Sequence, residues 1–220
     1  GAAIGLGIGY YLGTGNIPMI YLQNSGLGNI INPVLSLASE KVYGIPMLIM
    51  VGWRGEPGVK DEPQHVHQGK VMIGSLEGME LPYVVLSLDE KTAVEQTQNA
   101  LGLAREKMSP VVIVVRKNSF ESFPVERPLC DLELSREDAV IAVAEMLPED
   151  GVVVCTTGMP SRELFEFRAN NNQGHHRDFL TVGGMGHASQ IALGLCKAQP
   201  ERPTYCFDGD GAALMHLGAL

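Results

Sequence analysis

Apolar residues in this chain occur in short unbroken runs that do not alternate with polar residues. Seven such runs predict strands, at residues 19–22, 47–51, 83–86, 111–115, 152–155, 179–182 and 205–207. A strand that is apolar throughout is covered on both faces, as in a parallel sheet. Amphipathic stretches between the runs predict helices near residues 29–39, 90–107, 136–147 and 187–197. This alternation predicts an α/β fold with doubly wound, mainly parallel sheets.

The rhythm of strands and helices stops between residues 116 and 134, where prolines and mixed charges follow no period. A helix is predicted to begin directly after this segment, because Ser135 and Asp138 have the spacing of a capping box. We therefore expect two domains joined by a linker, with the first domain at residues 1–123, the linker at 124–134 and the second domain at 135–220.

The two predicted domains share a pattern of small residues. Shifting the chain by 185 residues brings Gly1 onto Gly186, Ala3 onto Ala188, Gly9 onto Gly194, Pro18 onto Pro203 and Gly26 onto Gly211. Each copy reads as a helix of small residues, a strand after a proline, and a glycine-rich loop. The match favours two copies of one α/β design.

The charge balance limits the classes of partner. Lysine and arginine number 16 against 25 aspartates and glutamates, a formal net charge of −9. Nucleic-acid backbones and anionic membranes both require clustered basic surface, so neither is an expected partner. A small anion would need a local basic pocket. No apolar run is long enough to span a bilayer.

Four cysteines bear on the cellular compartment: Cys130, Cys155, Cys196 and Cys206. No pair has C-x-x-C spacing and three lie in apolar segments, so we expect buried free thiols. Free thiols indicate a reducing cytoplasm. The chain begins without an initiator methionine in a helical glycine-rich stretch and stops inside another helical stretch. We therefore expect a fragment of a longer protein.

Three glycine-rich turns follow predicted strands in the second half of the chain, at residues 156–161, 182–188 and 207–213. In a parallel sheet the carboxyl ends of neighbouring strands lie at one edge, so the turns should converge on one crevice. Free N–H groups in such turns receive phosphate oxygens, and Asp208 and Asp210 suit a hard cation such as Mg²⁺. Alone, the third turn is equally compatible with an ordinary Asp-Gly turn. No complete dinucleotide fingerprint or P-loop motif is present, which makes a nicotinamide cofactor a minor alternative.

A polar segment at residues 52–69 follows the predicted strand at residues 47–51. Long polar loops at the carboxyl ends of strands often bind substrate. Side chains that can supply positive charge or protons here are Arg54, Lys60, His65 and His67. Taken alone, the segment is better interpreted as a solvated surface loop.

Motifs in both halves give a specific resemblance. The turn Gly209-Asp-Gly211 is similar to the start of the thiamine diphosphate motif, and Gly183-Gly-Met-Gly186 is similar to the Gly-Ser-(Met/Ile)-Gly turn of the same family, with glycine replacing serine. Residues 52–65, Gly-Trp-Arg-Gly-Glu-Pro-Gly followed by Val-Lys and Asp-Glu-Pro-Gln-His, resemble phosphonopyruvate decarboxylases. The chain thus resembles a thiamine-diphosphate-dependent 2-oxoacid decarboxylase over essentially its whole length.

The resemblance implies that residues 1–123 are a pyrimidine-binding domain and residues 135–220 a pyrophosphate-binding domain, both of the thiamine-diphosphate-binding type and each truncated. Asp210 would bind Mg²⁺, the Gly183 carbonyl would meet the aminopyrimidine, and Met185 would hold the cofactor bent. The other implied cofactor-binding residues are Thr157, Gly158, Gly184, Gly186, His187, Gly211 and Ala212. The activating glutamate and a further metal ligand of the family would lie outside the 220 residues.

The implied reaction is decarboxylation of 3-phosphonopyruvate to phosphonoacetaldehyde and CO₂, in phosphonate (2-aminoethylphosphonate) biosynthesis. Arg54, Lys60 and Gln64 would bind the substrate, and His65 or His67 would supply the proton that replaces CO₂. The alternative enzyme is a decarboxylase of sulfopyruvate or of another 2-oxoacid. A non-catalytic cofactor-binding subunit is the alternative of a different class. Because family members bind the cofactor between subunits, the resemblance also implies a homodimer at least.

Overall fold

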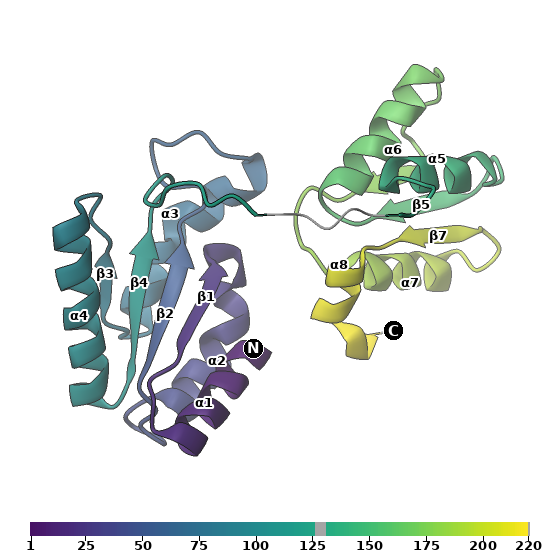
Figure 1. The fold of residues 1–220 in the computed structure, drawn as a ribbon. Coiled ribbons are helices and arrows are strands. Elements are labelled where there is room, and N and C mark those ends of the chain that lie inside the picture. The colour runs from purple at the N-terminus through teal and green to yellow at the C-terminus, as the bar shows by residue number, and fades with distance from the viewer. Residues whose placement is uncertain (126–130, 220) are drawn as a thin grey trace. The chain divides into compact units, whose positions relative to one another are not determined.

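The computed structural model describes residues 1–125 and 131–219. The chain divides into two compact units, Gly1–Val125 and Glu126–Leu220, and each contains one parallel sheet (Figure 1). The predicted fold class, α/β with mainly parallel sheets, is confirmed. The middle of the predicted linker and Cys130 lie outside the described residues. Within the described ranges, no helix combines the length and apolar character needed to cross a bilayer.

The first unit is built on a four-stranded sheet with the strand order β1-β2-β4-β3. The strands are β1 (Met19–Gln23), β2 (Met47–Gly52), β3 (Tyr83–Val85) and β4 (Pro110–Val115). The helices are α1 (Ala2–Thr14), α2 (Ile31–Pro33), α3 (Pro63–Gly78) and α4 (Glu90–Lys107). A 3-10 segment (Asn24–Ile30) precedes α2, and a π-helical turn (Val34–Ala38) follows it.

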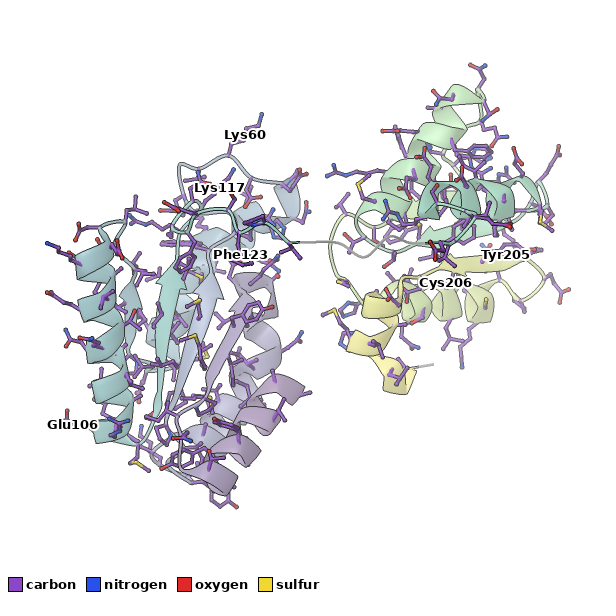
Figure 2. All side chains as sticks on the ribbon, in the orientation of Figure 1. Lys60, Glu106, Lys117, Phe123, Tyr205 and Cys206 are labelled. Carbon is purple, nitrogen blue, oxygen red and sulfur yellow. The ribbon has the colours of Figure 1, made fainter. Side chains whose placement is uncertain are left out.

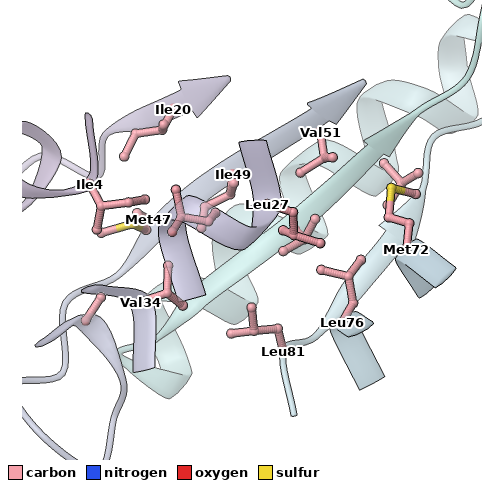
Figure 3. Packing of buried hydrophobic residues seen from close by; sticks show 14 of the residues in the cluster. Ile4, Ile20, Leu27, Val34, Met47, Ile49, Val51, Met72, Leu76 and Leu81 are labelled. Atoms are coloured by element: carbon pink, nitrogen blue, oxygen red, sulfur yellow. The ribbon is translucent and has the colours of Figure 1, made fainter. Parts of the chain in front are cut away.

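Successive residues of β2 face two different cores. Ile49 and Val51 are fully buried in one apolar cluster with Met72 of α3 (Figure 3). Leu48 packs with Ile113 of β4 in a second cluster, which α4 covers. Burial on both faces explains why the sequence of this strand shows no alternation between apolar and polar residues.

The second unit contains a three-stranded sheet with the strand order β6-β5-β7. The strands are β5 (Val152–Cys155), β6 (Asp178–Leu180) and β7 (Thr204–Phe207). The helices are α5 (Arg136–Glu145), α6 (Met159–Asn170), α7 (Ala188–Ala198) and α8 (Asp210–Met215), followed by a 3-10 turn (Leu217–Ala219). Val153 packs with Leu164 of α6 on one face, and Val154 packs with Ala192 of α7 on the other.

All seven predicted strands are present, and the capping box of Ser135 and Asp138 begins α5 as expected. The helix predicted near residues 29–39 is instead divided into 3-10, α and π pieces. The internal match at 185 residues also has a structural counterpart, because β1 begins at Met19 and β7 at Thr204. Each of these strands follows a helix and lies at an edge of its sheet.

Two helices were missed in the sequence, and one of them corrects an expectation. The segment 52–69 is not a loop throughout, because α3 begins at Pro63. Proline is well suited to the first turn of a helix, since its fixed φ fits and its missing N–H would be unpaired there. The first turns of α3 are polar, and the apolar residues that anchor it, Met72 and Leu76, come later. The other missed helix is α6, which follows the turn after β5.

The cysteine prediction is only partly correct. Cys155 is buried, and burial raises the pKa of its thiol. Cys196 and Cys206 are free but exposed, so the expectation of buried thiols is wrong for these two. The apolar run that contains Cys206 is an edge strand (Figure 2), and an edge strand is covered less completely than the central strand β5.

Candidate functional site

Thr156 follows β5, the central strand of the second unit. Its backbone N–H donates to the carbonyl oxygen of Phe207 (2.7 Å), and its own carbonyl oxygen accepts from the hydroxyl of Ser161 (2.7 Å). The residue is buried, yet its side-chain Oγ1 has no hydrogen-bond partner among the described residues. Because an unpaired buried hydroxyl costs free energy, this atom indicates a polar group supplied from elsewhere.

Gly158 begins α6 with φ 98° and ψ −140°, a conformation that favours glycine. Thr157 and Gly158 therefore lie at the N-terminus of a 12-residue helix. The first N–H groups of a helix have no partner within it, and the helix dipole is positive at this end. This position suits an anionic group.

The turn after β6 is anchored to the end of β5 by Thr181. The backbone N–H and the hydroxyl of Thr181 both donate to the carbonyl oxygen of Cys155, at 3.2 and 2.9 Å. Gly184 and Gly186 then adopt left-handed conformations, with φ of 66° and 90°. The ring Nδ1 of His187 lies 2.9 Å from the carbonyl oxygen of Gly184 and stabilises this bend.

The turn after β7 carries two exposed carboxylates. Asp208 accepts a hydrogen bond from the N–H of Gly209 (3.0 Å), and Asp210 accepts one from the N–H of Gly211 (2.7 Å). Each aspartate uses Oδ1 for this bond. The turn thus fixes the two carboxylates at the start of α8.

The structure brings the three turns together. A Cβ placed on Gly211 would lie 3.2 Å from Cε of Met185, which joins the second turn to the third. A Cβ on Gly209 would lie 3.9 Å from the methyl group of Thr156, which joins the third turn to the first. These contacts agree with the convergence expected for turns at the carboxyl ends of parallel strands.

His216 is a residue of this region that sequence reasoning missed. Its Nδ1 lies 3.1 Å from the carbonyl oxygen of Gly186, and its ring centroid lies 4.7 Å from that of His187. A Cβ on Gly186 would come within 3.1 Å of the carbonyl oxygen of Ala212, so this glycine permits the close approach of α8. In the sequence His216 occurs inside an apolar run, where nothing marks it as a contact of a turn 30 residues earlier.

These residues fit a diphosphate group with a divalent cation. The unpaired Thr156 hydroxyl and the N-terminus of α6 can donate hydrogen bonds to phosphate oxygens. The described residues contain no cluster of three or more histidine, cysteine or acidic side chains placed to hold a metal. A Mg²⁺ ion that takes most of its oxygens from phosphates and water needs only one or two carboxylates, and Asp208 and Asp210 offer two.

In the first unit, Arg54 is held by Asp61. Nε of Arg54 donates to Oδ2 of Asp61 (2.8 Å) and Nη2 donates to Oδ1 (2.6 Å). Asp61 also accepts the backbone N–H groups of Gly55 and Glu62, each at 2.8 Å. The hydrogen bonds from Arg54 keep the pKa of Asp61 well below its usual range, with the backbone bonds adding to the effect. The charge of Arg54 is therefore balanced within its own loop.

Asn24 fastens the same loop to the end of β1. Its side chain donates to the carbonyl oxygen of Arg54 (2.7 Å) and accepts from the N–H of Arg54 (3.1 Å). Asn24 is buried, so both bonds are shielded from water. Sequence reasoning missed this asparagine, because its partner is 30 residues away.

The histidines selected from the sequence lie at the start of α3. His65 and His67 are two residues apart, so their side chains point in directions roughly 200° apart around the helix. His65 is half-buried and its Nδ1 has no partner among the described residues, whereas His67 is exposed. Gln64 is half-buried, and Lys60 lies exposed at the tip of the preceding loop (Figure 2). The structure therefore does not bring both histidines to one point.

Comparisons with known proteins agree with the resemblance. Residues 156–220 match the family described as "Thiamine pyrophosphate enzyme, C-terminal TPP binding domain". The whole chain is 34% identical to a phosphonopyruvate decarboxylase of Streptomyces viridochromogenes, of which the match covers 57%. Over 99% of the chain, identity to a sulfopyruvate decarboxylase of Methanosarcina acetivorans is 30%, with 59% of that protein covered.

A shorter match involves a protein named as a subunit. Over 40% of the chain, identity to "Sulfopyruvate decarboxylase subunit beta" of Methanothermobacter thermautotrophicus is 44%, with 43% of that protein covered. The chain thus spans less than two thirds of the length of these curated relatives.

Proposed function

We propose that the chain belongs to the thiamine pyrophosphate enzyme family and that the protein decarboxylates 3-phosphonopyruvate to phosphonoacetaldehyde and CO₂. The observation that carries the proposal is the unpaired, buried hydroxyl of Thr156 beside three glycine-rich turns at the carboxyl ends of β5, β6 and β7. Identity of 34% to phosphonopyruvate decarboxylases over the whole of this chain, and over 57% of those relatives, supports the substrate. Phosphonate biosynthesis is the proposed context.

We assign the diphosphate of the cofactor to the turns of the second unit. Thr157, Gly158, Gly186, His187, Gly211 and Ala212 line it in this proposal, and Asp210 binds the Mg²⁺ ion. The carbonyl of Gly183 would accept from the aminopyrimidine and Met185 would support the cofactor, while the left-handed Gly184 shapes the turn. When bound, the thiazolium ring supplies the electron sink for the carbon–carbon bond that breaks.

We assign the substrate to the loop and helix that follow β2. Arg54 is oriented by its bidentate bonds to Asp61, and these bonds use two of its N–H groups. A guanidinium has five N–H groups, so about three stay free for oxygens of the substrate. Gln64 and Lys60 extend the set of donors. His65 is the better proton donor of the two histidines, because its ring is half-buried and its Nδ1 has no partner among the residues that the structure describes.

The second candidate substrate is 3-sulfopyruvate. Identity of 30% over 99% of the chain to a sulfopyruvate decarboxylase favours it. The two substrates have the same 2-oxoacid part and differ in the charge of the tail, since a phosphonate carries up to two negative charges near neutral pH and a sulfonate one. The protein would therefore distinguish the two substrates by the charge of the side chains that surround this tail.

We also propose self-association and a cytoplasmic location. Relatives named as subunits support assembly. Cys155, Cys196 and Cys206 are free thiols, which suits a reducing compartment. Full activity in a species that light scattering identifies as a monomer would contradict the assembly.

The test uses the full-length protein with thiamine diphosphate and Mg²⁺. The two substrates are supplied together, CO₂ release is measured, and phosphonoacetaldehyde is followed by its phosphorus NMR signal. We expect a kcat/KM that is higher for phosphonopyruvate. A preference for sulfopyruvate would mean that sulfopyruvate, and not phosphonopyruvate, is the substrate. Release of no CO₂ from any 2-oxoacid would favour a non-catalytic subunit.

A further inference from the structure

A cavity of ≈ 310 Å³ lies in the first unit at the carboxyl ends of β1, β2 and β4. Gln23 comes from the end of β1, Trp53 and Arg54 follow β2, and Arg116 and Lys117 follow β4. Ligand sites of proteins begin at about this volume, and α/β sheets place them at this edge. The cavity is therefore in the right part of the fold for a small molecule.

The charges that line the cavity do not cancel. Its walls contain three cations, Arg54, Arg116 and Lys117, and two carboxylates, Glu56 and Asp61. Asp61 pairs with Arg54 at 2.6 Å, and Glu56 pairs with Arg116 at 3.1 Å. Lys117 has no carboxylate partner among the described residues, which leaves a local excess of one positive charge in a chain of net charge −9.

We propose that this cavity is the subsite for the anionic tail of the substrate, with the Lys117 ammonium as its uncompensated charge. The inference rests on the proposed function. Arg54 and Arg116 are already neutralised by carboxylates that are mostly covered, at 14% and 16% exposure, so recruiting either cation in full would require breaking an ion pair. The Lys117 ammonium can approach a new anion without that cost.

The position of Lys117 supports the assignment. Figure 2 shows Lys117 and Lys60 at the same end of the first unit, whereas Glu106 lies at the opposite end. Lys117 follows β4, which lies between β2 and β3 and so reaches the middle of this edge of the sheet. Lys60 lies on the loop between β2 and α3 and does not line the cavity.

In this proposal the Lys117 ammonium lies beside the tail of the substrate, and phosphonopyruvate, sulfopyruvate and pyruvate differ only in that tail. The attraction of the ammonium should be greatest for a phosphonate dianion, smaller for a sulfonate monoanion, and absent for the methyl group of pyruvate. A charge-assisted contact of this kind corresponds to about tenfold or more in affinity. Because the cavity is open to solvent, the attraction should also weaken as salt increases.

The experiment compares Lys117→Met with Lys91→Met in the full-length protein with thiamine diphosphate and Mg²⁺. Lys91 is an exposed lysine in the first turn of α4 and lies outside the cavity, so its variant is a matched control for loss of one surface charge. KM and kcat are measured for phosphonopyruvate and for pyruvate. Binding of 3-phosphonopropionate is measured by calorimetry without turnover, and Lys117→Arg tests whether another cation restores the function.

For Lys117→Met we expect KM for phosphonopyruvate to rise about tenfold or more, with kcat and KM for pyruvate nearly unchanged. Affinity for 3-phosphonopropionate should fall in parallel, and Lys117→Arg should recover most of both losses. An equal loss for both substrates, or no change for phosphonopyruvate, overturns the tail subsite. If the wild-type protein decarboxylates no 2-oxoacid, the proposed function fails, and the binding of 3-phosphonopropionate by wild type and Lys117→Met still decides the subsite.

Discussion

The carbonyl oxygen of Gly55 occupies the position that a side chain on Gly69 would need, 1.8 Å from the ideal Cβ. Gly55 itself is left-handed, with φ 68°, and a Cβ there would lie 2.0 Å from the carbonyl oxygen of His65. The indole N–H of Trp53 donates to the carbonyl oxygen of Gly69 at 2.9 Å. The backbones of α3 and the loop after β2 are thus in direct contact, and this contact determines where the first turns of α3 lie.

A methyl group at Gly69 should therefore separate the helix from the loop. We expect Gly69→Ala to reduce the free energy of unfolding by about 1–3 kcal/mol, because the clash is with backbone that cannot rotate away. Gly74 is the matched control in the same helix, since a Cβ there meets no atom within 4 Å. Gly74→Ala should instead stabilise by about 0.5–1 kcal/mol. Urea titrations of the two variants measure the difference, and similar stabilities would contradict the contact.

The pair of Arg54 and Asp61 predicts a specific acid response. The folded-state pKa of Asp61 is depressed, so the pair contributes full stability above the unfolded pKa of about 3.9 and loses it as pH falls through the lower folded value. Trp53 is the single tryptophan of the 220 residues and reports on this loop. We expect its emission to be constant from neutral pH to about pH 5 and to change only in stronger acid.

Asp61→Asn isolates that response from other carboxylates. The variant cannot form the charged pair, so its tryptophan emission should already differ from wild type at neutral pH. The acid transition should then be weaker. An emission profile identical to that of wild type across the range would mean that the pair does not order the loop.

The proposed metal site depends on the charge of Asp210. Asp210→Asn keeps the shape of the side chain but removes the charged oxygen that a hard cation prefers. We expect Mg²⁺-dependent affinity for thiamine diphosphate to fall by about tenfold or more, with the Mg²⁺-independent affinity little changed. Titration of the full-length protein with and without Mg²⁺ measures both quantities. Unchanged Mg²⁺-dependent affinity would mean that Asp210 does not bind the metal and only shapes the turn.

Thr156 and Thr181 form a matched pair for testing the unpaired hydroxyl. The Thr181 hydroxyl donates to the carbonyl oxygen of Cys155 at 2.9 Å, whereas the Thr156 hydroxyl has no partner in the described part of the chain. Without cofactor, Thr181→Val should destabilise by about 1 kcal/mol, and Thr156→Val should be neutral or stabilising. With cofactor, Thr156→Val should show the larger loss of affinity. If Thr156→Val destabilises the cofactor-free protein as Thr181→Val does, the hydroxyl has a structural role.

The sequence predicts the sheets well because a strand that is buried on both faces is a continuous run of apolar residues. Val111 to Val115 is a continuous apolar run, and each of these residues is covered from one face or the other. The start of α3 is harder to predict, since Pro63 to Lys70 is mostly polar and its position depends on the contact between Gly69 and Gly55. A contact between two glycines leaves no mark in apolar periodicity.

The glycine turns are predictable as a group because each follows a strand. Their partners are not, because Asn24 and His216 act on residues about 30 positions away. The partner of Arg54 was likewise not predictable. The sequence identifies Arg54 as a cation, but only the folded loop reveals that Asp61 neutralises it. The sequence also did not single out Lys117, and only the fold shows that it has no carboxylate partner among the described residues.

The strand order of the first unit also has a consequence for synthesis of the chain on the ribosome. β4 is the last of the four strands to be made, yet it lies between β2 and β3 and pairs with both. Until residue 115 has left the exit tunnel, β2 can pair with β1, but β3 has no strand beside it. The strand edges of the nascent unit therefore stay exposed until β4 is made, and exposed edges are sites of misassociation. Pairing of β4 with both β2 and β3 then completes the sheet in one late step.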